Sequence, residues 1–296
     1  MNIIIPNLRI PILHDIAQCL ESVATIAGTS TLLWDTQNKS LLDMFDEYHP
    51  NIVFLHEEQL NSAFAVACQE FDFKYVLISQ NPYEDLPKEA SAILTLKPFL
   101  HHFKNHSAVM EVENYARIAQ LHGAKYQDHM RSEVLVHSVG YTPTDEIWEV
   151  LYFLTSSHNT KIIGDTAVSL HNYLGKVNMF ERANFIKSTQ IVVDIQGHDF
   201  WDASYLKAAP VCMHTQHSHS LQFTNVESLK THIDLLLSND KERQTYTEKC
   251  YKYTSDSNTY YHFTAQLFNL IKEADVADHL LNFVFQIFNT PEESAA

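Results

Sequence analysis

Short apolar runs alternate with longer amphipathic stretches along the first hundred residues. Short apolar runs between turn-forming residues are typical of buried strands, whereas apolar residues spaced three and four apart predict helices. Continuous apolar strands separated by helices indicate a parallel sheet that is covered on both faces. The strands predicted here are Asn2–Pro6, Ser30–Trp34, Ile52–Leu55, Tyr75–Ser79 and Ala92–Leu96, and the helices are Pro11–Ala27, Ser40–Tyr48 and Gln59–Phe71.

The same alternation starts again near residue 133, after a stretch in which helical turns but no strand are predicted. The strands predicted in this half are Glu133–His137, Lys161–Ile163, Ile191–Ile195 and Pro210–Met213. The helices are Thr144–Ser156, Met179–Ser188, Trp201–Lys207, Val226–Ser238, Lys241–Ser255, Thr259–Ala274 and Ala277–Phe288.

We therefore predict an α/β fold with two Rossmann-like domains that face each other across a cleft. The N-terminal domain is expected at 1–100, a connection at 101–130 and the C-terminal domain at 131–275. The final helix, at 276–296, needs a partner for its apolar face, and we expect it to pack back on the N-terminal half.

The composition supports an ordinary globular protein, with 45% hydrophobic and 19% charged residues. Its apolar runs are too short to cross a bilayer, and Met1–Pro6 resembles a first strand more than a secretion signal. Four scattered cysteines without a CxxC pair favour a reducing compartment, so we expect a cytoplasmic protein. A net charge of −16 argues against nucleic acid as a partner, and a homo-oligomer stays open.

Three of the six glycines, Gly140, Gly164 and Gly197, each follow the end of a predicted strand in the second half. Ligands of open α/β sheets bind at the carboxyl ends of the strands, and glycine lets a ligand approach the backbone closely. These positions therefore indicate a ligand site at that edge. The alternative is that they are ordinary turn glycines.

Several segments of the second half resemble a known family. They are Lys161–Gly164, Tyr173–Val177, Ile186–Ser188, Asp199–Cys212, Leu221–Phe223 and Val226–Leu237. Over about residues 130–270 the chain resembles the C-terminal half of GT-B glycosyltransferases, in particular the CgeB-like (spore-protein-like) branch. The resemblance implies a transferase that moves a sugar from a nucleotide-sugar donor, bound by the second half, to an acceptor that the sequence does not identify.

A nucleotide-sugar carries a diphosphate, which needs backbone N–H groups and a cation. Gly140 and Tyr141, before a helix, offer the N–H groups, and Lys176 and Lys207 are candidate cations, although each is also explained as a surface lysine. Asp199 and Asp202 are candidates for holding hydroxyl groups, and a helix cap is the other explanation for Asp199. The candidate donor-binding residues are Gly140, Tyr141, Gly164, Lys176, Gln196, Gly197, His198, Asp199, Asp202 and Lys207.

An inverting transferase needs a base in the acceptor half to deprotonate the incoming hydroxyl. His56 and Glu57, directly after a predicted strand, are the best-placed candidates, and His14 is second. His56 is alternatively a helix cap, and a retaining enzyme would use neither residue as a base. No cofactor and no metal are expected, because this fold usually stabilises the leaving phosphate with lysines, helix dipoles and N–H groups.

Two positions depart from the family pattern. Ala203, or Asp202 if the alignment shifts by one residue, stands where a glutamate usually holds the ribose, and Ala208 replaces a glycine. These departures favour an alternative function, a catalytically inactive GT-B-like protein that binds a nucleotide or a sugar.

Overall fold

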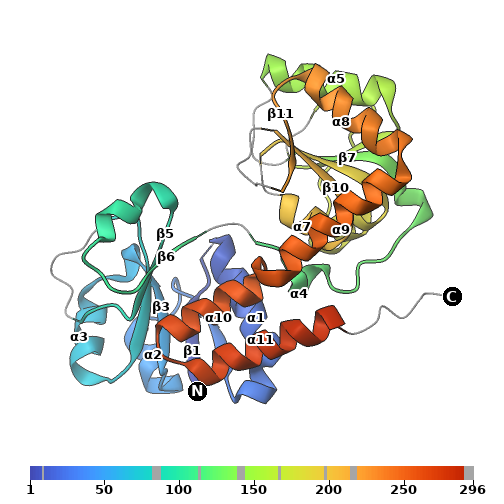
Figure 1. Ribbon diagram of the computed structural model, residues 1–296. Coiled ribbons are helices and arrows are strands. Elements are labelled where there is room, and N and C mark those ends of the chain that lie inside the picture. Colours follow the sequence, from blue (N-terminus) through green and yellow to red (C-terminus); the bar gives the residue numbers. More distant parts are fainter. Residues whose placement is uncertain are drawn as a thin grey trace. The chain divides into compact units, whose positions relative to one another are not determined.

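The computed structural model describes residues 1–8, 10–81, 88–112, 115–138, 144–165, 168–196, 199–213 and 219–289. The chain divides into two compact units. The first comprises Met1–Glu113 and Tyr260–Ala296, and the second comprises Asn114–Thr259. Each unit has its own parallel sheet with helices packed on it (Figure 1).

The first unit has a six-stranded sheet in the order β2-β1-β3-β4-β5-β6, and every pairing is parallel. The strands are β1 Asn2–Pro6, β2 Ser30–Trp34, β3 Ile52–His56, β4 Lys74–Ile78, β5 Ala92–Thr95 and β6 Val109–Glu111. The helices are α1 Pro11–Ala27, α2 Leu41–Tyr48, η1 Glu57–Gln59, α3 Ser62–Glu70, η2 Lys97–Phe103, α10 Tyr260–Leu270 and α11 Ala274–Asn289.

Local sequence signals explain where several of these helices begin and end. Pro11 occupies the first turn of α1, where the missing N–H costs nothing, and Gly28 ends the helix with φ of 60°. Ser40 and Asp43 form a reciprocal capping box at the start of α2. Alternate strand residues such as Ile4 and Val53 pack against α2 and α3 in one buried cluster.

The last two helices both belong to the first unit. α11 and α10 pack against each other and on α1, where the Tyr261 hydroxyl lies 2.9 Å from Ser22 Oγ (Figure 1). The sequence pattern predicts that the C-terminal domain ends at residue 275, whereas in the structure the second unit ends at Thr259. The apolar side of α10 includes Tyr261 and Phe263, which are fully buried, and it finds its partner surface in the first unit.

The predicted connection at 101–130 is also corrected. β6 lies inside it and extends the first sheet as an edge strand beside β5. All three residues of β6 are half-buried, and a strand of three residues leaves too short a pattern to recognise.

The second unit has a five-stranded sheet in the order β11-β10-β9-β7-β8, again with parallel pairings. The strands are β7 Ser132–Ser138, β8 Thr160–Gly164, β9 Thr189–Asp194, β10 Ala209–Met213 and β11 Leu221–Phe223. The helices are α4 Ile118–Leu121, η3 Asp128–Met130, α5 Asp145–Ser157, α6 Met179–Lys187, α7 Phe200–Tyr205, α8 Val226–Ser238 and α9 Asp240–Ser257.

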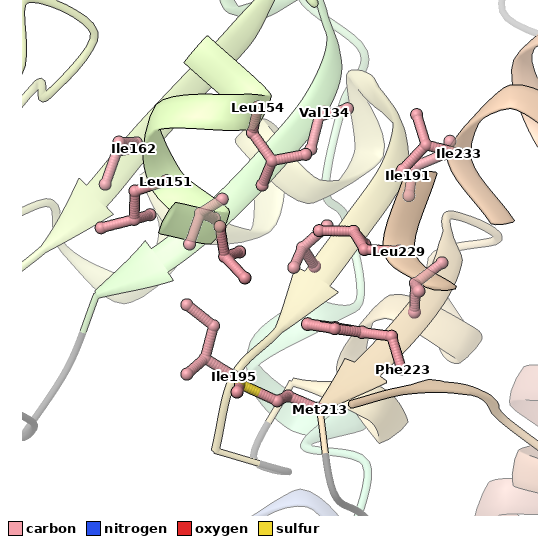
Figure 2. Close-up of a cluster of buried hydrophobic side chains, with 14 of the residues drawn as sticks. Val134, Leu151, Leu154, Ile162, Ile191, Ile195, Met213, Phe223, Leu229 and Ile233 are labelled. Carbon is pink, nitrogen blue, oxygen red and sulfur yellow. The ribbon is translucent and has the colours of Figure 1, made fainter. Parts of the chain in front are cut away.

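Aliphatic side chains from one face of this sheet meet α5 and α8. Val134 and Ile191 come from the central strands, and Leu154 and Ile233 from the two helices (Figure 2). The opposite face carries Leu135 and packs against α6 and α7. Burying both faces explains why these strands read as continuous apolar runs.

The two sheets share one topology. If the strands of each unit are counted from its own start, the first five occur in the order 2-1-3-4-5. This confirms the predicted fold class of two parallel α/β units. In such sheets the strand order reverses beside the first strand, and ligands bind at the carboxyl ends of the strands at this switch point. The switch points lie between β1 and β3 and between β7 and β9.

Candidate functional site

The candidate catalytic residues gather at the switch point of the first sheet. His14 lies in the first turn of α1, directly after β1, and its Nε2 is 3.0 Å from Gln18 Nε2. His56 is the last residue of β3, and Glu57 follows it. Because β1 and β3 are parallel neighbours, these residues share the carboxyl edge of the sheet.

Two neutral side chains donate hydrogen bonds to Glu57. Its Oε2 accepts hydrogen bonds from Ser79 Oγ at 2.9 Å and from Asn81 Nδ2 at 3.3 Å. Ser79 is 2% exposed and follows β4, so the neighbouring strand supplies these donors. Glu57 as a whole is half-buried.

His56 caps the short helix η1. Its backbone N–H donates to Gln59 Oε1 at 2.8 Å, and its Nδ1 accepts a long hydrogen bond of 3.5 Å from the N–H of Glu58. The capping role that we considered for His56 is therefore present in the structure. Of the three candidates, Glu57 has the best-defined geometry.

At the second sheet, four donor-site candidates lie outside the described residues: Gly140, Tyr141, Gly197 and His198. In the sequence they follow β7 and β9, the two strands that border the switch point. Gln196 is described, is exposed, and donates its backbone N–H to Asp194 Oδ1 at 3.2 Å.

Asp199 and Asp202 do not present free carboxylates to a ligand. Both bind the guanidinium of Arg182, which donates its Nη2 to Asp199 Oδ1 and its Nη1 to Asp202 Oδ2 at 2.8 Å. Asp199 is 4% exposed and Asp202 is fully buried. This corrects our hypothesis that they hold donor hydroxyls, because a buried carboxylate that already pairs with arginine has lost that capacity.

Two further residues complete this group, which we call the Arg182 cluster: Arg182, Asp199, Asp202, Arg117 and His137. Asp202 Oδ1 accepts the backbone N–H of Arg117 at 3.1 Å. His137 Nδ1 lies 3.0 Å from Asp199 Oδ1. Burial acts to raise the pKa of Asp199, but the positive charge of Arg182 and the hydrogen bonds from His137 and Arg182 outweigh it and hold that pKa well below its usual range.

A third carboxylate, Asp194, supports the start of α7. It ends β9, and its Oδ2 accepts the N–H groups of Asp199 and Phe200, both at 2.9 Å. The capping role that we had considered for Asp199 thus belongs to Asp194, which satisfies two N–H groups at the end of the helix.

Gly164 is explained by contact between two strands. It ends β8 with φ of 138°, and a Cβ atom there would lie 2.0 Å from the carbonyl oxygen of Ser138 on β7. Its own carbonyl accepts a hydrogen bond of 2.9 Å from the Tyr173 hydroxyl. The close approach that requires glycine is therefore between β7 and β8, and this favours the structural explanation for this glycine.

The two candidate lysines lie at opposite edges of the second sheet. Lys176 follows Gly175, whose carbonyl accepts the N–H of Gly164 at 3.0 Å, so it lies at the carboxyl edge. It is exposed, and no described carboxylate lies within ion-pair distance. Lys207 lies two residues before β10 and thus at the amino edge, where its Nζ is 3.5 Å from Glu248 Oε2. Its position does not fit contact with a ligand at the carboxyl edge.

The sequence pattern does not single out Arg182 or His137 as candidate site residues. Arg182 lies in a helix between charged and apolar residues, and nothing local distinguishes it from a surface arginine. His137 lies near the end of an apolar strand. A polar residue within a predicted buried strand was the available signal, because such a side chain needs a buried partner.

The architecture can be compared with proteins of known structure. No family model and no curated protein sequence matches the chain. An α-glucosyltransferase in complex with UDP and a 13-mer DNA containing an HMU base has a TM-score of 0.63 and 12% identity, covering 92% of this chain and 99% of its own. Anabaena HepE in complex with UDP-glucose has a TM-score of 0.58 and 11% identity, covering 91% and 98%. A glycosyltransferase from Rickettsia africae has a TM-score of 0.54 and 10% identity, covering 98% of each chain.

These similarities extend over nearly the whole of each chain. The protein therefore has the GT-B fold. At identities of 12% or less, the similarity establishes the fold alone. None of the described helices is both long and apolar enough to span a membrane.

Proposed function

We propose that the protein is a glycosyltransferase that moves a sugar from a nucleotide-sugar donor to a hydroxyl group of an acceptor. The observation that supports this most is the repeated 2-1-3-4-5 topology, which gives each unit a switch point of the kind at which ligands of such sheets bind. The GT-B fold and the UDP and UDP-glucose bound to two structural neighbours agree with it. The motifs at 130–270 favour the CgeB-like branch, and we propose a cytoplasmic location.

The donor is proposed to bind at the switch point between β7 and β9. Gly140, Tyr141 and Gly197 follow these strands and supply backbone N–H groups to the diphosphate. Lys176 supplies a positive charge, since it is exposed at this edge and pairs with no described carboxylate. Gln196 and His198 follow β9 and would contact the sugar. Lys207, Asp199 and Asp202 are left out of the proposed contacts.

The acceptor is proposed to bind at the first switch point, where Glu57 is the base. In an inverting transfer the acceptor oxygen attacks the anomeric carbon, Glu57 accepts the hydroxyl proton, and the bond from that carbon to the diphosphate breaks. Ser79 and Asn81 orient the carboxylate. His56 and His14 line the same edge and are alternative bases. We propose that no metal is required, because N–H groups and Lys176 stabilise the leaving diphosphate.

We also propose that the acceptor is not a nucleic acid. One structural neighbour binds DNA, but a net charge of −16 repels a phosphate backbone at long range. A titration with labelled duplex and single-stranded DNA at low salt tests this. Saturable binding below micromolar concentration would contradict it.

Two measurements on the full-length chain test the proposed function. Thermal unfolding with UDP, GDP, ADP and CMP should show a raised midpoint for at least one nucleotide, since a ligand that binds the folded state stabilises it. Release of that nucleotide from its sugar conjugate should follow, slowly without acceptor, and should not depend on added metal. Binding without release would favour the inactive nucleotide-binding protein, and no binding by any nucleotide-sugar would reject both functions.

A further inference from the structure

His137 is the penultimate residue of β7, a strand that borders the second switch point. Its side chain is 19% exposed, whereas those of Arg182 and Asp199 are each 5% exposed. The imidazole is therefore more exposed than the two side chains that it contacts in the Arg182 cluster. It is the one residue of the cluster on a strand of this edge.

A single ring nitrogen of His137 makes all its described contacts. Nδ1 lies 3.0 Å and 3.1 Å from the two carboxylate oxygens of Asp199. The Nε of Arg182 lies 3.3 Å from the same nitrogen. A protonated Nδ1 donates to Asp199, and an unprotonated Nδ1 accepts from Arg182, so in either case the ring is held through Nδ1. Nε2, across the ring, has no hydrogen-bond partner among the described residues.

The protonation states of the ring determine what Nε2 offers. If Nδ1 accepts from Arg182, the proton of the neutral ring is on Nε2, and in the charged ring both nitrogens carry protons. Both states present an N–H at Nε2. An anion beside Nε2 stabilises both of them over the neutral form whose proton is on Nδ1.

The cations of the cluster are already engaged. Arg182 binds two carboxylates, and Arg117 Nη1 lies 3.4 Å from Asp202 Oδ2. Their charges are largely offset inside the cluster, so they are poorly suited to a ligand. The imidazole differs because its outer nitrogen is not engaged by the described cluster.

We propose that His137 is a diphosphate-binding residue, whose Nε2 donates a hydrogen bond to an anionic oxygen of a nucleoside diphosphate. Asp199 and Arg182 act as positioning residues that fix the ring through Nδ1. This inference rests on the proposed function, because the donor supplies the diphosphate. It adds a side-chain contact that neither the glycines nor the lysines indicated.

Two substitutions separate the contributions of the two ring nitrogens to binding. In His137→Asn the amide occupies the place of Nδ1 and keeps a contact for Asp199, but nothing replaces Nε2. In His137→Gln the longer side chain carries an amide N–H near the place of Nε2. His158→Asn is the matched control, since His158 follows α5 and lies at the amino edge of the same sheet.

Calorimetry on the full-length variants, with UDP, GDP, uridine, guanosine and pyrophosphate as probes, tests the proposal. We expect His137→Asn to weaken the binding of pyrophosphate, and of whichever of UDP and GDP binds the wild type more tightly, by about tenfold to a hundredfold. The affinity for uridine and guanosine should stay unchanged. His137→Gln should recover most of this loss, and His158→Asn should bind as the wild type does. Thermal unfolding should show that His137→Asn keeps the wild-type midpoint better than His137→Gln.

The outcomes distinguish the two proposals. Wild-type diphosphate affinity in His137→Asn would overturn the role of His137, even if the protein transfers a sugar. An equal loss of nucleoside and diphosphate affinity would also overturn it. If pyrophosphate binds through His137 but no nucleotide binds, the anion site is supported and the proposed nucleotide-sugar donor is rejected. Absence of pyrophosphate and nucleotide binding in the wild type would reject both.

Discussion

Carboxylates at the carboxyl edges of the two sheets lie in different surroundings. On the first sheet, Glu57 is half-buried and accepts hydrogen bonds from neutral partners, Ser79 and Asn81. On the second, Asp199 and Asp202 are buried and bound to Arg182. A carboxylate with neutral partners and some exposure can exchange protons with a substrate. A carboxylate that is paired with a buried arginine instead holds its helix in place. An acidic residue that follows a strand is therefore not, by that position alone, a residue that acts on a substrate.

The strongest test of this comparison is the loss of Glu57. Glu57→Gln keeps the size of the side chain and removes its basicity, so we expect kcat for sugar transfer to fall by about 10²–10⁴-fold. Donor affinity should stay unchanged, because the donor is proposed to bind the second unit. Steady-state kinetics and nucleotide calorimetry measure both. Glu58→Gln is the control, since Glu58 is exposed and adjacent; an equal fall in both variants would contradict the assignment.

At the carboxyl edge of the second sheet, removal of the Arg182 charge should lower the stability of the protein. Arg182→Met leaves Asp199 and Asp202 buried with much of their compensating charge removed, and we expect it to cost about 3–5 kcal/mol in the free energy of unfolding. Urea unfolding followed by circular dichroism measures this. Arg131→Met, an exposed arginine of the same unit, should leave the free energy unchanged. If Arg182→Met were equally harmless, the Arg182 cluster would not hold α6 and α7 in place.

We expect low pH to destabilise the second unit through protonation of Asp199. Its pKa is lowered in the folded state, so the unfolded chain binds more protons and stability rises with pH. This contribution is fully present above the ordinary carboxyl pKa of about 4 and is lost as the pH falls through the lower folded value. Asp199→Asn should therefore show a smaller difference in urea midpoint between pH 7 and pH 3 than the wild type. An unchanged difference would remove Asp199 from the acid response.

The smallest effect is expected at Lys176, on the second sheet. Lys176→Gln should weaken nucleoside diphosphate binding by about tenfold, because one exposed charge contact is lost. Lys207→Gln removes the same charge at the amino edge and should leave the affinity unchanged. Calorimetry on both variants measures this. A larger loss in Lys207→Gln would move the donor site away from the carboxyl edge.

The alternation of apolar runs and amphipathic stretches was enough to predict most of the fold. It located Asn2–Pro6, Pro11–Ala27 and Val226–Ser238 with the bounds that the structure has. These elements are determined locally, since strand and helix periods differ and Pro11 and Asn225 mark where two of the helices begin. Two parallel α/β units followed from the same pattern.

Packing between distant segments determined the features that the sequence pattern did not predict. β6 forms because β5 offers an unpaired edge, and α10 joins the first unit because its apolar side packs there. The partner of Asp199 and Asp202 is an arginine 17 and 20 residues away, on another helix, and His137 meets Asp199 across 62 residues. The sequence determined that acidic side chains follow β9. Only the tertiary structure decided which of them are neutralised, because the energy of a buried charge depends on the groups that folding brings within a few ångströms of it.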